Sequence, residues 1–404
     1  MASVLREGWE EKTLKEITSH LGDGLHGTPK YTDNGEYYFV NGNNLNDGKI
    51  IFKESTKRVS LEEYEKYKKN LTDRTILVSI NGTLGNVAFY NNEKIVLGKS
   101  ACYFNLCEGI DKNFIKYILI SPYFLSYAHK EATGATIKNV SLKTMRELKI
   151  NLPPFQEQKR IVAILDEAFS ATDKAKANAE LNLQNAKELF ESYLQGIFEN
   201  KGTDWKEESI KNLTELVTKG SSPKWQGISY VDEGGIFFLT SKNVGEGKLL
   251  LSNKKYLEEK FNDIQKTSIL KKGDVLTNIV GASIGRTAIY DLNEITNINQ
   301  AVCLMRCLPE KIYNYYLMYL LNSPFFKKIL HDNEVDNARA NLSLTFFKNL
   351  LIPLPPLTEQ KEIVKKINLF SSETKKLESI YTQKLQDLEE LKKSILEKAF
   401  NGEL

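Results

Sequence analysis

The sequence repeats itself over almost its whole length, and this repeat limits the possible folds more than any other feature. LPPFQEQKRIV begins at Leu152, and LPPLTEQKEIV begins at Leu354. Other matched stretches keep the same order: YYFVNGNNLNDGKI answers IFFLTSKNVGEGKL, and ILVSINGTLGNVAFY answers VLTNIVGASIGRTAIY. The offset between partners drifts only from 196 to 202 residues. Because such a drift requires only short loop insertions, each half should be a copy of one fold.

Each copy combines a globular part with a long helix. In the globular part, short β-branched and aromatic runs alternate with Gly, Asn and Asp, which indicates strands and turns. The proline pairs at 153–154 and 355–356 cannot lie inside a helix and should direct the chain into the helix that follows. The sequence therefore predicts an α+β fold in four segments, which are globular domains at 1–153 and 201–355 and helices at 154–200 and 356–404.

The two long helices carry heptad seams that favour pairing with each other. The predicted seam positions are Ile161, Leu165, Ala168, Thr172, Ala175, Ala179, Asn182, Ala186, Leu189 and Tyr193, and then Ile363, Ile367, Phe370, Thr374, Leu377, Tyr381, Lys384, Leu388, Leu391 and Ile395. Both seams carry polar residues at matching places, Thr172 with Thr374 and Asn182 with Lys384, a device that can set register. Small residues of one seam face large residues of the other. We therefore expect an antiparallel coiled coil that relates the two domains by a pseudo-two-fold axis.

Composition adds a few limits. A formal charge of +3 does not mark a nucleic-acid-binding protein, although 55 Lys and Arg residues could still gather on one face. No apolar run approaches the roughly 20 residues that span a bilayer, and the first residues lack the apolar core of a signal peptide, so we expect no membrane and a cytoplasmic location. The cysteines stand in apolar, strand-like text, which favours reduced, buried thiols: Cys102, Cys107, Cys303 and Cys307.

Motifs for catalysis do not fit the sequence around them. GDGLHG at Gly22 matches a dinucleotide fingerprint, but Pro29 follows where a helix should open. NLPPF at Asn151 is close to the Asn-Pro-Pro-Phe of amino-methyltransferases, yet Leu152 interrupts it and the repeat reads PLPPL. The four histidines show no metal or triad spacing, and no nucleotide-binding loop occurs. We predict no catalytic residue, cofactor or metal.

The arrangement resembles the specificity subunit of Type I restriction-modification enzymes over essentially the whole chain. Both halves carry a Trp near the domain start (Trp9, Trp205), a Gly-then-Pro turn (HGTPKY, KGSSPKW), a glycine turn after a strand, and a closing PP-x-x-EQ, which is the most specific feature. The resemblance implies two target-recognition domains that each read half of a split, asymmetric sequence in double-stranded DNA. The helices would set the spacing. Two modification subunits and the restriction subunits would supply catalysis, so this chain would be no enzyme.

Turn-rich segments of each domain offer side chains for phosphates and base edges. The candidates in the first domain are Lys30, Tyr31, Asn41, Asn43, Asn44, Lys49, Lys138 and Asn139. Those in the second are Lys219, Ser221, Ser222, Lys224, Trp225, Lys242, Asn243, Arg286, Asn299, Gln300 and Arg339. Asn299 and Gln300 come from an NQA stretch that the first domain lacks, because GKSACYF stands in its place.

Two other functions stay open on the sequence alone. The first is an adaptor whose paired helices hold two protein-binding domains apart without contacting DNA. The second is a self-sufficient methyltransferase, which would bind S-adenosylmethionine without a partner.

Overall fold

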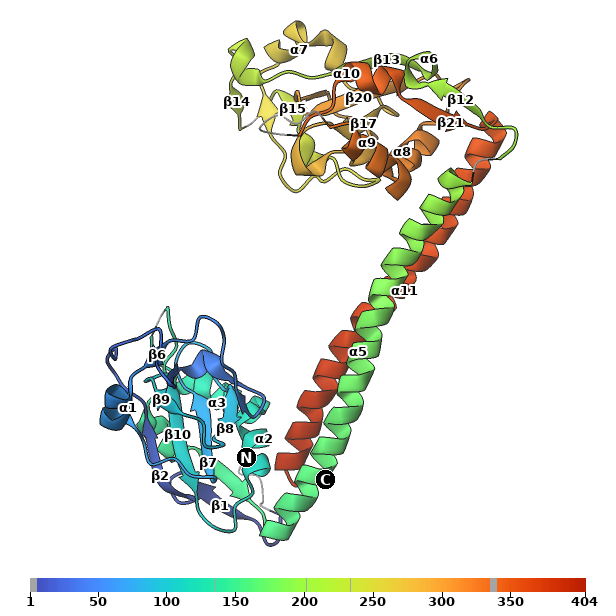
Figure 1. Cartoon of the computed structure of the whole chain (residues 1–404). Helices are drawn as coiled ribbons and strands as arrows, with labels where there is room; N and C mark the ends of the chain where they lie inside the picture. The colour runs from blue at the N-terminus through green and yellow to red at the C-terminus, as the bar shows by residue number, and fades with distance from the viewer. Residues whose placement is uncertain (1–5, 135, 201, 233, 335–339) are drawn as a thin grey trace. The chain divides into compact units, whose positions relative to one another are not determined.

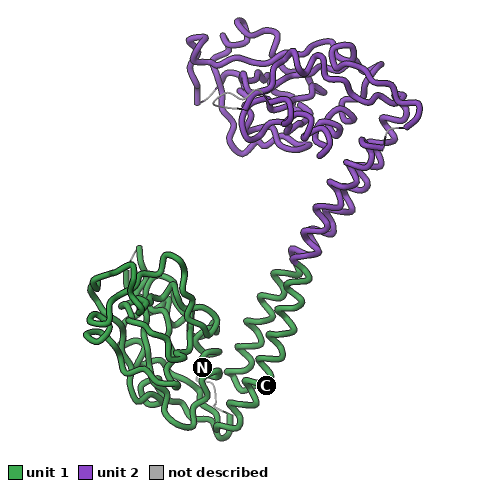
Figure 2. The backbone as a smooth tube through the Cα atoms, in the orientation of Figure 1, with its two compact units in different colours: residues 1–179, 383–404 green, residues 180–382 purple. Residues whose placement is uncertain are grey.

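The computed structural model of the chain describes residues 6–134, 136–200, 202–232, 234–334 and 340–404. It divides into two compact units, Met1–Ala179 with Gln383–Leu404 and Glu180–Thr382 (Figure 2). Each unit holds one globular domain together with one end of each long helix (Figure 1).

The first unit contains these elements in chain order: β1 (Glu10–Thr13), β2 (Thr18–Asp23), β3 (Tyr37–Val40), η1 (Gly42–Asn44), β4 (Leu45–Asn46), β5 (Lys49–Ile50), β6 (Arg58–Val59), α1 (Leu61–Tyr67), β7 (Thr75–Ser79), β8 (Val87–Phe89), β9 (Ile95–Leu97), β10 (Ala101–Leu106), α2 (Lys112–Ile120), α3 (Pro122–Glu131), α4 (Leu142–Glu147) and β11 (Lys149–Leu152). The long helix α5 (Phe155–Glu199) follows and ends in the second unit.

The second unit repeats the pattern: β12 (Lys206–Ser209), α6 (Ile210–Leu213), β13 (Thr214–Lys219), η2 (Pro223–Gln226), β14 (Tyr230–Val231), β15 (Ile236–Leu239), η3 (Ser241–Asn243), β16 (Tyr256–Leu257), α7 (Lys260–Ile264), η4 (Lys266–Ser268), β17 (Val275–Asn278), η5 (Gly281–Ser283), β18 (Thr287–Ile289), β19 (Thr296–Ile298), β20 (Val302–Cys307), α8 (Asn314–Asn322), α9 (Pro324–Asp332), α10 (Leu344–Asn349) and β21 (Leu351–Leu354). The second long helix is α11 (Leu357–Phe400).

The sheets of the two domains match, as the repeat predicts. A four-stranded antiparallel sheet has the order β2-β10-β7-β8 in the first domain and β13-β20-β17-β18 in the second. A smaller sheet contains one parallel pair in each domain, β3 with β9 and β15 with β19. The first strand of each domain pairs with its last, β1 with β11 and β12 with β21, so the domain closes just before its long helix.

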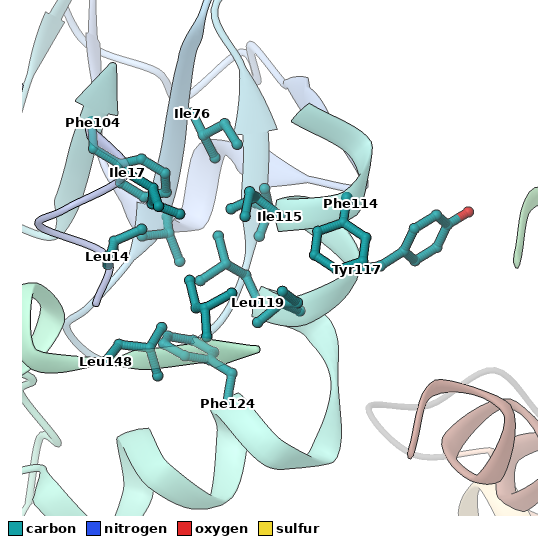
Figure 3. Close-up of a cluster of buried hydrophobic side chains, with 14 of the residues drawn as sticks. Leu14, Ile17, Ile76, Phe104, Phe114, Ile115, Tyr117, Leu119, Phe124 and Leu148 are labelled. Carbon is teal, nitrogen blue, oxygen red and sulfur yellow. The ribbon is translucent and has the colours of Figure 1, made fainter. Parts of the chain in front are cut away.

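The inner strands of the four-stranded sheet are buried on both faces, which explains their largely apolar runs, whereas the edge strand β2 is partly exposed. All six residues of β10 are buried. Cys102 and Phe104 face the helices α2 to α4, and Figure 3 shows part of this cluster. Ala101 and Tyr103 alternate with them and face the smaller sheet.

The ends of the long helices complete both helical clusters. Ile161, Leu165 and Leu396 join the core of the first domain, while Phe198 and Ile367 join that of the second. Each domain is therefore packed onto both helices through the same apolar core that holds its sheet.

The long helices run antiparallel where they meet inside each unit, as predicted. In the first unit, Lys176 of α5 pairs with Glu389 of α11 at 2.6 Å, and Asp173 pairs with Lys392. In the second, the rings of Tyr193 and Phe370 lie against each other at a tilt of 30°, with their centroids 4.3 Å apart.

The predicted seam is wrong at four of its twenty positions, whereas the other sixteen are buried or half-buried. Leu189 is 49% exposed, and its neighbour Phe190 packs on the core instead. Lys384 is exposed, whereas Leu385 is half-buried. The predicted seam residues Leu377 and Leu391 also lie exposed.

The matched threonines of the seam are buried, but each hydroxyl is used within its own helix. Thr172 donates to the carbonyls of Ala168 and Phe169 at 3.0 Å each, and Thr374 bonds the preceding turn of α11 in the same way. These hydroxyls are satisfied without an interhelical partner, so they do not set the register by pairing.

Candidate nucleic-acid interface

Five loops of the first domain meet at one end of the four-stranded sheet. We call them loop hub 1: residues 24–28, 41–44, 79–86, 98–100, 133–134 and 136–140. Backbone hydrogen bonds hold them together: Lys99 donates to Leu25 at 3.0 Å, Gly98 to Val40 at 2.8 Å, Ile80 to Ser100 at 3.0 Å and Gly82 to Lys138 at 3.0 Å. Segments far apart in the sequence thus present their side chains on one rigid frame.

The second domain builds the same frame, loop hub 2, from residues 220–222, 240–244, 278–286, 299–301 and 340–342. Asn299 donates to Leu239 at 3.0 Å, Ile279 to Ala301 at 2.9 Å and Gly281 to Ala340 at 2.9 Å. These bonds reproduce those of loop hub 1 at matched positions. The sequence-matched loops are therefore also matched in space.

A glycine opens each hub because the backbone passes too close to a neighbouring strand for any side chain. A Cβ atom would lie 2.2 Å from the Leu97 carbonyl oxygen at Gly24 and 1.6 Å from that of Ile298 at Gly220. Gly24, and not Gly27 of HGTPKY, is therefore the counterpart of Gly220. The predicted match between the two Gly-then-Pro turns is therefore wrong for Gly27. The spacing also differs, because Gly27 stands two residues before its proline and Gly220 stands three residues before its own.

Two predicted contact residues are occupied by the fold itself. Asn44 and Asn243 are 5% and 3% exposed. Each amide oxygen accepts a backbone N–H three residues earlier at 3.0 Å, and each amide nitrogen donates to a carbonyl seven residues later, at Ile51 and at Leu250. Both side chains therefore stabilise the loops from inside, and we no longer count them as candidates for contact with DNA. Asn41 is half-buried and accepts from the Ser100 hydroxyl at 3.0 Å.

The missing NQA stretch has a structural equivalent in the first domain. Gly98, Lys99 and Ser100 occupy the places of Asn299, Gln300 and Ala301, as the matched hydrogen bonds of Gly98 and Asn299 show. Lys99 is exposed and was not predicted. Aligning the strands through Cys102 and Cys303 would have found it.

An open hollow of about 520 Å³ lies in loop hub 1 and is lined by both polar and apolar residues: Asp23, His26, Ile80, Asn81, Lys99, Asn139, Val140, Ser141 and Leu142. Asn81 donates its side-chain amide to Asn139 Oδ1 at 3.2 Å. His26 Nε2 lies 2.7 Å from Asp23 Oδ2. Asn81 and His26 were also not predicted, because short polar residues in turns carry no distinctive spacing.

The other predicted residues divide by place. Exposed in or beside the hubs are Asn43, Lys138, Lys219, Lys242 and Arg286, and half-buried there are Asn139, Ser221, Ser222, Asn299 and Gln300. Outside hub 1, Lys30 donates its backbone N–H to Glu63 of α1, Tyr31 packs edge-on against Phe39, and Lys49 lines a pocket with Phe89 and Lys112. Arg339 lies outside the described residues.

An aromatic and basic surface lies next to loop hub 2. Trp225 on η2 is 77% exposed and follows the exposed Lys224. Tyr230 is 55% exposed, with the Lys255 ammonium 5.2 Å from its ring centre. Flat rings beside cations suit contact with a sugar-phosphate backbone or with an unstacked base.

Within the described residues, no group of three or more His, Cys, Asp or Glu side chains is arranged to hold a metal ion. Across the same ranges, no helix has both the length and the apolar character that crossing a bilayer requires.

The family model for the Type I restriction modification DNA specificity domain matches residues 6–183 and 202–389. The chain is 27% identical to the EcoBI specificity subunit of Escherichia coli, an alignment that covers 81% of this chain and 73% of that protein. It is 27% identical to the MjaVIII specificity subunit of Methanocaldococcus jannaschii, covering 83% and 81% of the two chains.

Solved structures share the fold. A chain from work on complex assembly and conformational transition of the type I R-M system aligns with a TM-score of 0.75 at 19% identity, covering 99% of this chain and all of the other. The HsdS subunit from Thermoanaerobacter tengcongensis aligns with a TM-score of 0.63 at 18% identity, covering 99% and 98%.

Proposed function

The chain belongs to the Type I restriction-modification DNA specificity family, with two copies of its domain, and we propose that the two loop hubs are the surfaces that read its DNA target. As a specificity subunit it supplies recognition, while catalysis belongs to other subunits. The target would be split and asymmetric, one half for each domain. We also propose that the functional segments of the chain divide at residues 153, 200 and 355, as the sequence predicts.

One observation carries the assignment of the reading surfaces: the same backbone frame displays different side chains in the two domains. The hubs share their hydrogen bonds but differ in the side chains at matched positions, such as exposed Lys99 against half-buried Gln300 and exposed Asn43 against exposed Lys242. A scaffold that holds constant geometry and varies its exposed loops is suited to reading different sequences. Two different half-sites follow from this difference.

The chemistry of the two matched positions suggests what each one reads. A lysine can donate to O6 and N7 of guanine in the major groove, and a glutamine can bond N6 and N7 of adenine bidentately. We therefore assign Lys99 to a guanine of one half-site and Gln300 to an adenine of the other. Lys138, Lys219 and Lys242 would bind phosphates and position the domains.

Two modification subunits and the restriction subunits would assemble on the chain, one modification subunit for each repeat. The repeat supports this stoichiometry, because two matched domain-and-helix joints offer two matched docking places. A subunit that acts on host DNA works in the cytoplasm, where we expect this chain.

A single-molecule methylation map of host DNA tests the proposal. The neighbouring modification subunit is expressed with this chain, without it, and with a chain in which Lys68 is changed to Gln as a matched control, since Lys68 is exposed just after α1 and belongs to neither hub. We expect a two-part motif with a fixed gap that disappears only without the chain. Unchanged methylation although the complex assembles would favour the adaptor, and methylation without any modification subunit would favour a self-sufficient methyltransferase.

A further inference from the structure

The most specific motif of the sequence, PP-x-x-EQ, lies away from both loop hubs, and its glutamines are the most deeply buried polar groups of the joints between domains and helices. Gln158 is 1% exposed and Gln360 is 0% exposed. Both stand in the first turn of a long helix, α5 or α11. A buried amide must use its donors and acceptor, so its partners reveal its role.

Gln158 connects three parts of the first unit. Its amide oxygen accepts the backbone N–H of Asp111, the residue that caps α2, at 2.8 Å. Its amide nitrogen donates to the carbonyl of Gly109 at 3.3 Å and to that of Pro153 at 2.9 Å. One side chain thus ties the start of α5 to the start of α2 and to the end of the last strand.

Gln360 makes the same three bonds in the second unit. Its oxygen accepts the N–H of Tyr313 at 2.7 Å, and its nitrogen donates to Lys311 at 3.2 Å and to Pro355 at 2.9 Å. Tyr313 immediately precedes α8, the counterpart of α2. The two repeats therefore preserve the hydrogen-bond network as well as the residue.

A second tether lies two turns further along each helix. The hydroxyl of Tyr117 on α2 donates to Asp166 of α5 at 2.5 Å, and that of Tyr319 on α8 donates to Asn368 of α11 at 2.6 Å. Figure 3 shows the Tyr117 ring leaving the apolar cluster with its hydroxyl directed away from it. Two tethers on one helix restrict its rotation against the domain, which one tether alone would allow.

We propose that these two joints, Gln158 with Tyr117–Asp166 and Gln360 with Tyr319–Asn368, set the length of the DNA gap by holding each domain at one angle on its helix. This inference rests on the proposed function. A domain of this size has a lever arm of about 25 Å, so a 10° tilt would move its reading loops about 4 Å. Since one base pair rises about 3.4 Å, such a tilt would change the gap that is read.

The test is a methylation map of the assembled complex with Gln158→Met and, separately, with the double variant Tyr117→Phe, Tyr319→Phe. Methionine keeps the volume of glutamine but makes none of its hydrogen bonds, and phenylalanine removes only the hydroxyl, so the second variant folds even if the first does not. Gln156→Met is the matched control, because Gln156 is exposed two residues away. Thermal unfolding of each variant is measured in parallel.

We expect the half-site bases to stay the same while methylation at gaps one base pair longer or shorter rises about tenfold relative to methylation at the wild-type gap. Gln158→Met removes the three hydrogen bonds of Gln158, and the double variant removes one hydrogen bond from each joint. The control should keep a single gap. A single unchanged gap in the tyrosine double variant would overturn the proposal, and so would altered half-site bases. A wild-type map without any two-part motif would instead overturn the proposed function.

Discussion

At the residue scale, a substitution at Gln300, the counterpart of Lys99, tests whether the loop hubs read DNA. Gln300→Lys should weaken methylation of the original second half-site about 10- to 100-fold and favour guanine where adenine stood, because lysine cannot offer adenine the paired donor and acceptor of an amide. The first half-site should not change. Selection of methylated sites from a randomised library measures both, with Lys68→Gln as the control. A second half-site that keeps its adenine would contradict the assignment.

The Cys303 thiol offers a second residue-scale prediction. Burial in the sheet raises its pKa from an ordinary value near 9.0 to about 12. The native thiol therefore stays protonated at pH 8.5, and iodoacetamide should label it only when the chain unfolds. The unfolded chain ionises at a lower pH than the native one, so this thiol stabilises the fold below pH 9.0 and loses that contribution as the pH rises toward 12. Mass spectrometry after labelling with and without urea checks this, and rapid native labelling would contradict it.

Residue roles within turns were the part of the site that sequence could predict least. Asn44 and Asn243 stand at matched positions of the two repeats, and so do candidates that the structure retains, such as Asn43 and Lys242. Matching alone cannot tell an amide that caps a loop from one that faces a ligand, because both need a short polar side chain in a turn. Burial separates them, and burial depends on contacts with residues 51 and 250 that no local pattern contains.

At the scale of elements, the sequence predicts both long helices and most of their buried positions, but it misses four positions of the seam. Phe190 and Leu385 face the packing where Leu189 and Lys384 were expected. A seam read as alternating steps of 4 and 3 assumes a partner helix along its whole length. Here each helix end also packs on a domain, and Phe190 lies against the core of the second domain, one position beyond the predicted Leu189.

Phe190→Ala and Leu189→Ala form a matched pair that tests this shift. Phe190 packs on the core of the second domain, so its truncation should lower the free energy of unfolding by about 2 kcal/mol. Leu189 is 49% exposed, and its truncation should cost under about 0.5 kcal/mol. Urea unfolding measures both. If both variants lost the same free energy of unfolding, Leu189 would contribute to the packing as the strict heptad predicts.

At the scale of the whole molecule, the repeat made the fold predictable. Two sequences that are similar only in short stretches still build the same strand order and the same joints, because both bury the same alternation of apolar runs and end in the same Pro-Pro-x-x-Glu-Gln stretch. Matched positions also differ inside the domains, since Asn105 bonds Thr75 in the first domain where Arg306 pairs with Asp274 in the second. The repeat therefore predicted the shared frame, but not which side chains each domain displays on it.

The last prediction concerns the helices as a spacer. One heptad is inserted between Gln184 and Asn185 of α5, and another between Ile380 and Tyr381 of α11. These points are opposite by the register of Lys176 with Glu389 and of Tyr193 with Phe370.

Seven residues are nearly two helical turns and add about 10 Å, so the packing faces stay aligned and the gap should lengthen by about three base pairs while both half-sites stay unchanged. Insertion into α5 alone should abolish methylation, because the helices then lose their register. The methylation map of the assembled complex distinguishes these results. Altered half-sites after the paired insertion would mean that the helices take part in reading the bases and do more than separate the domains.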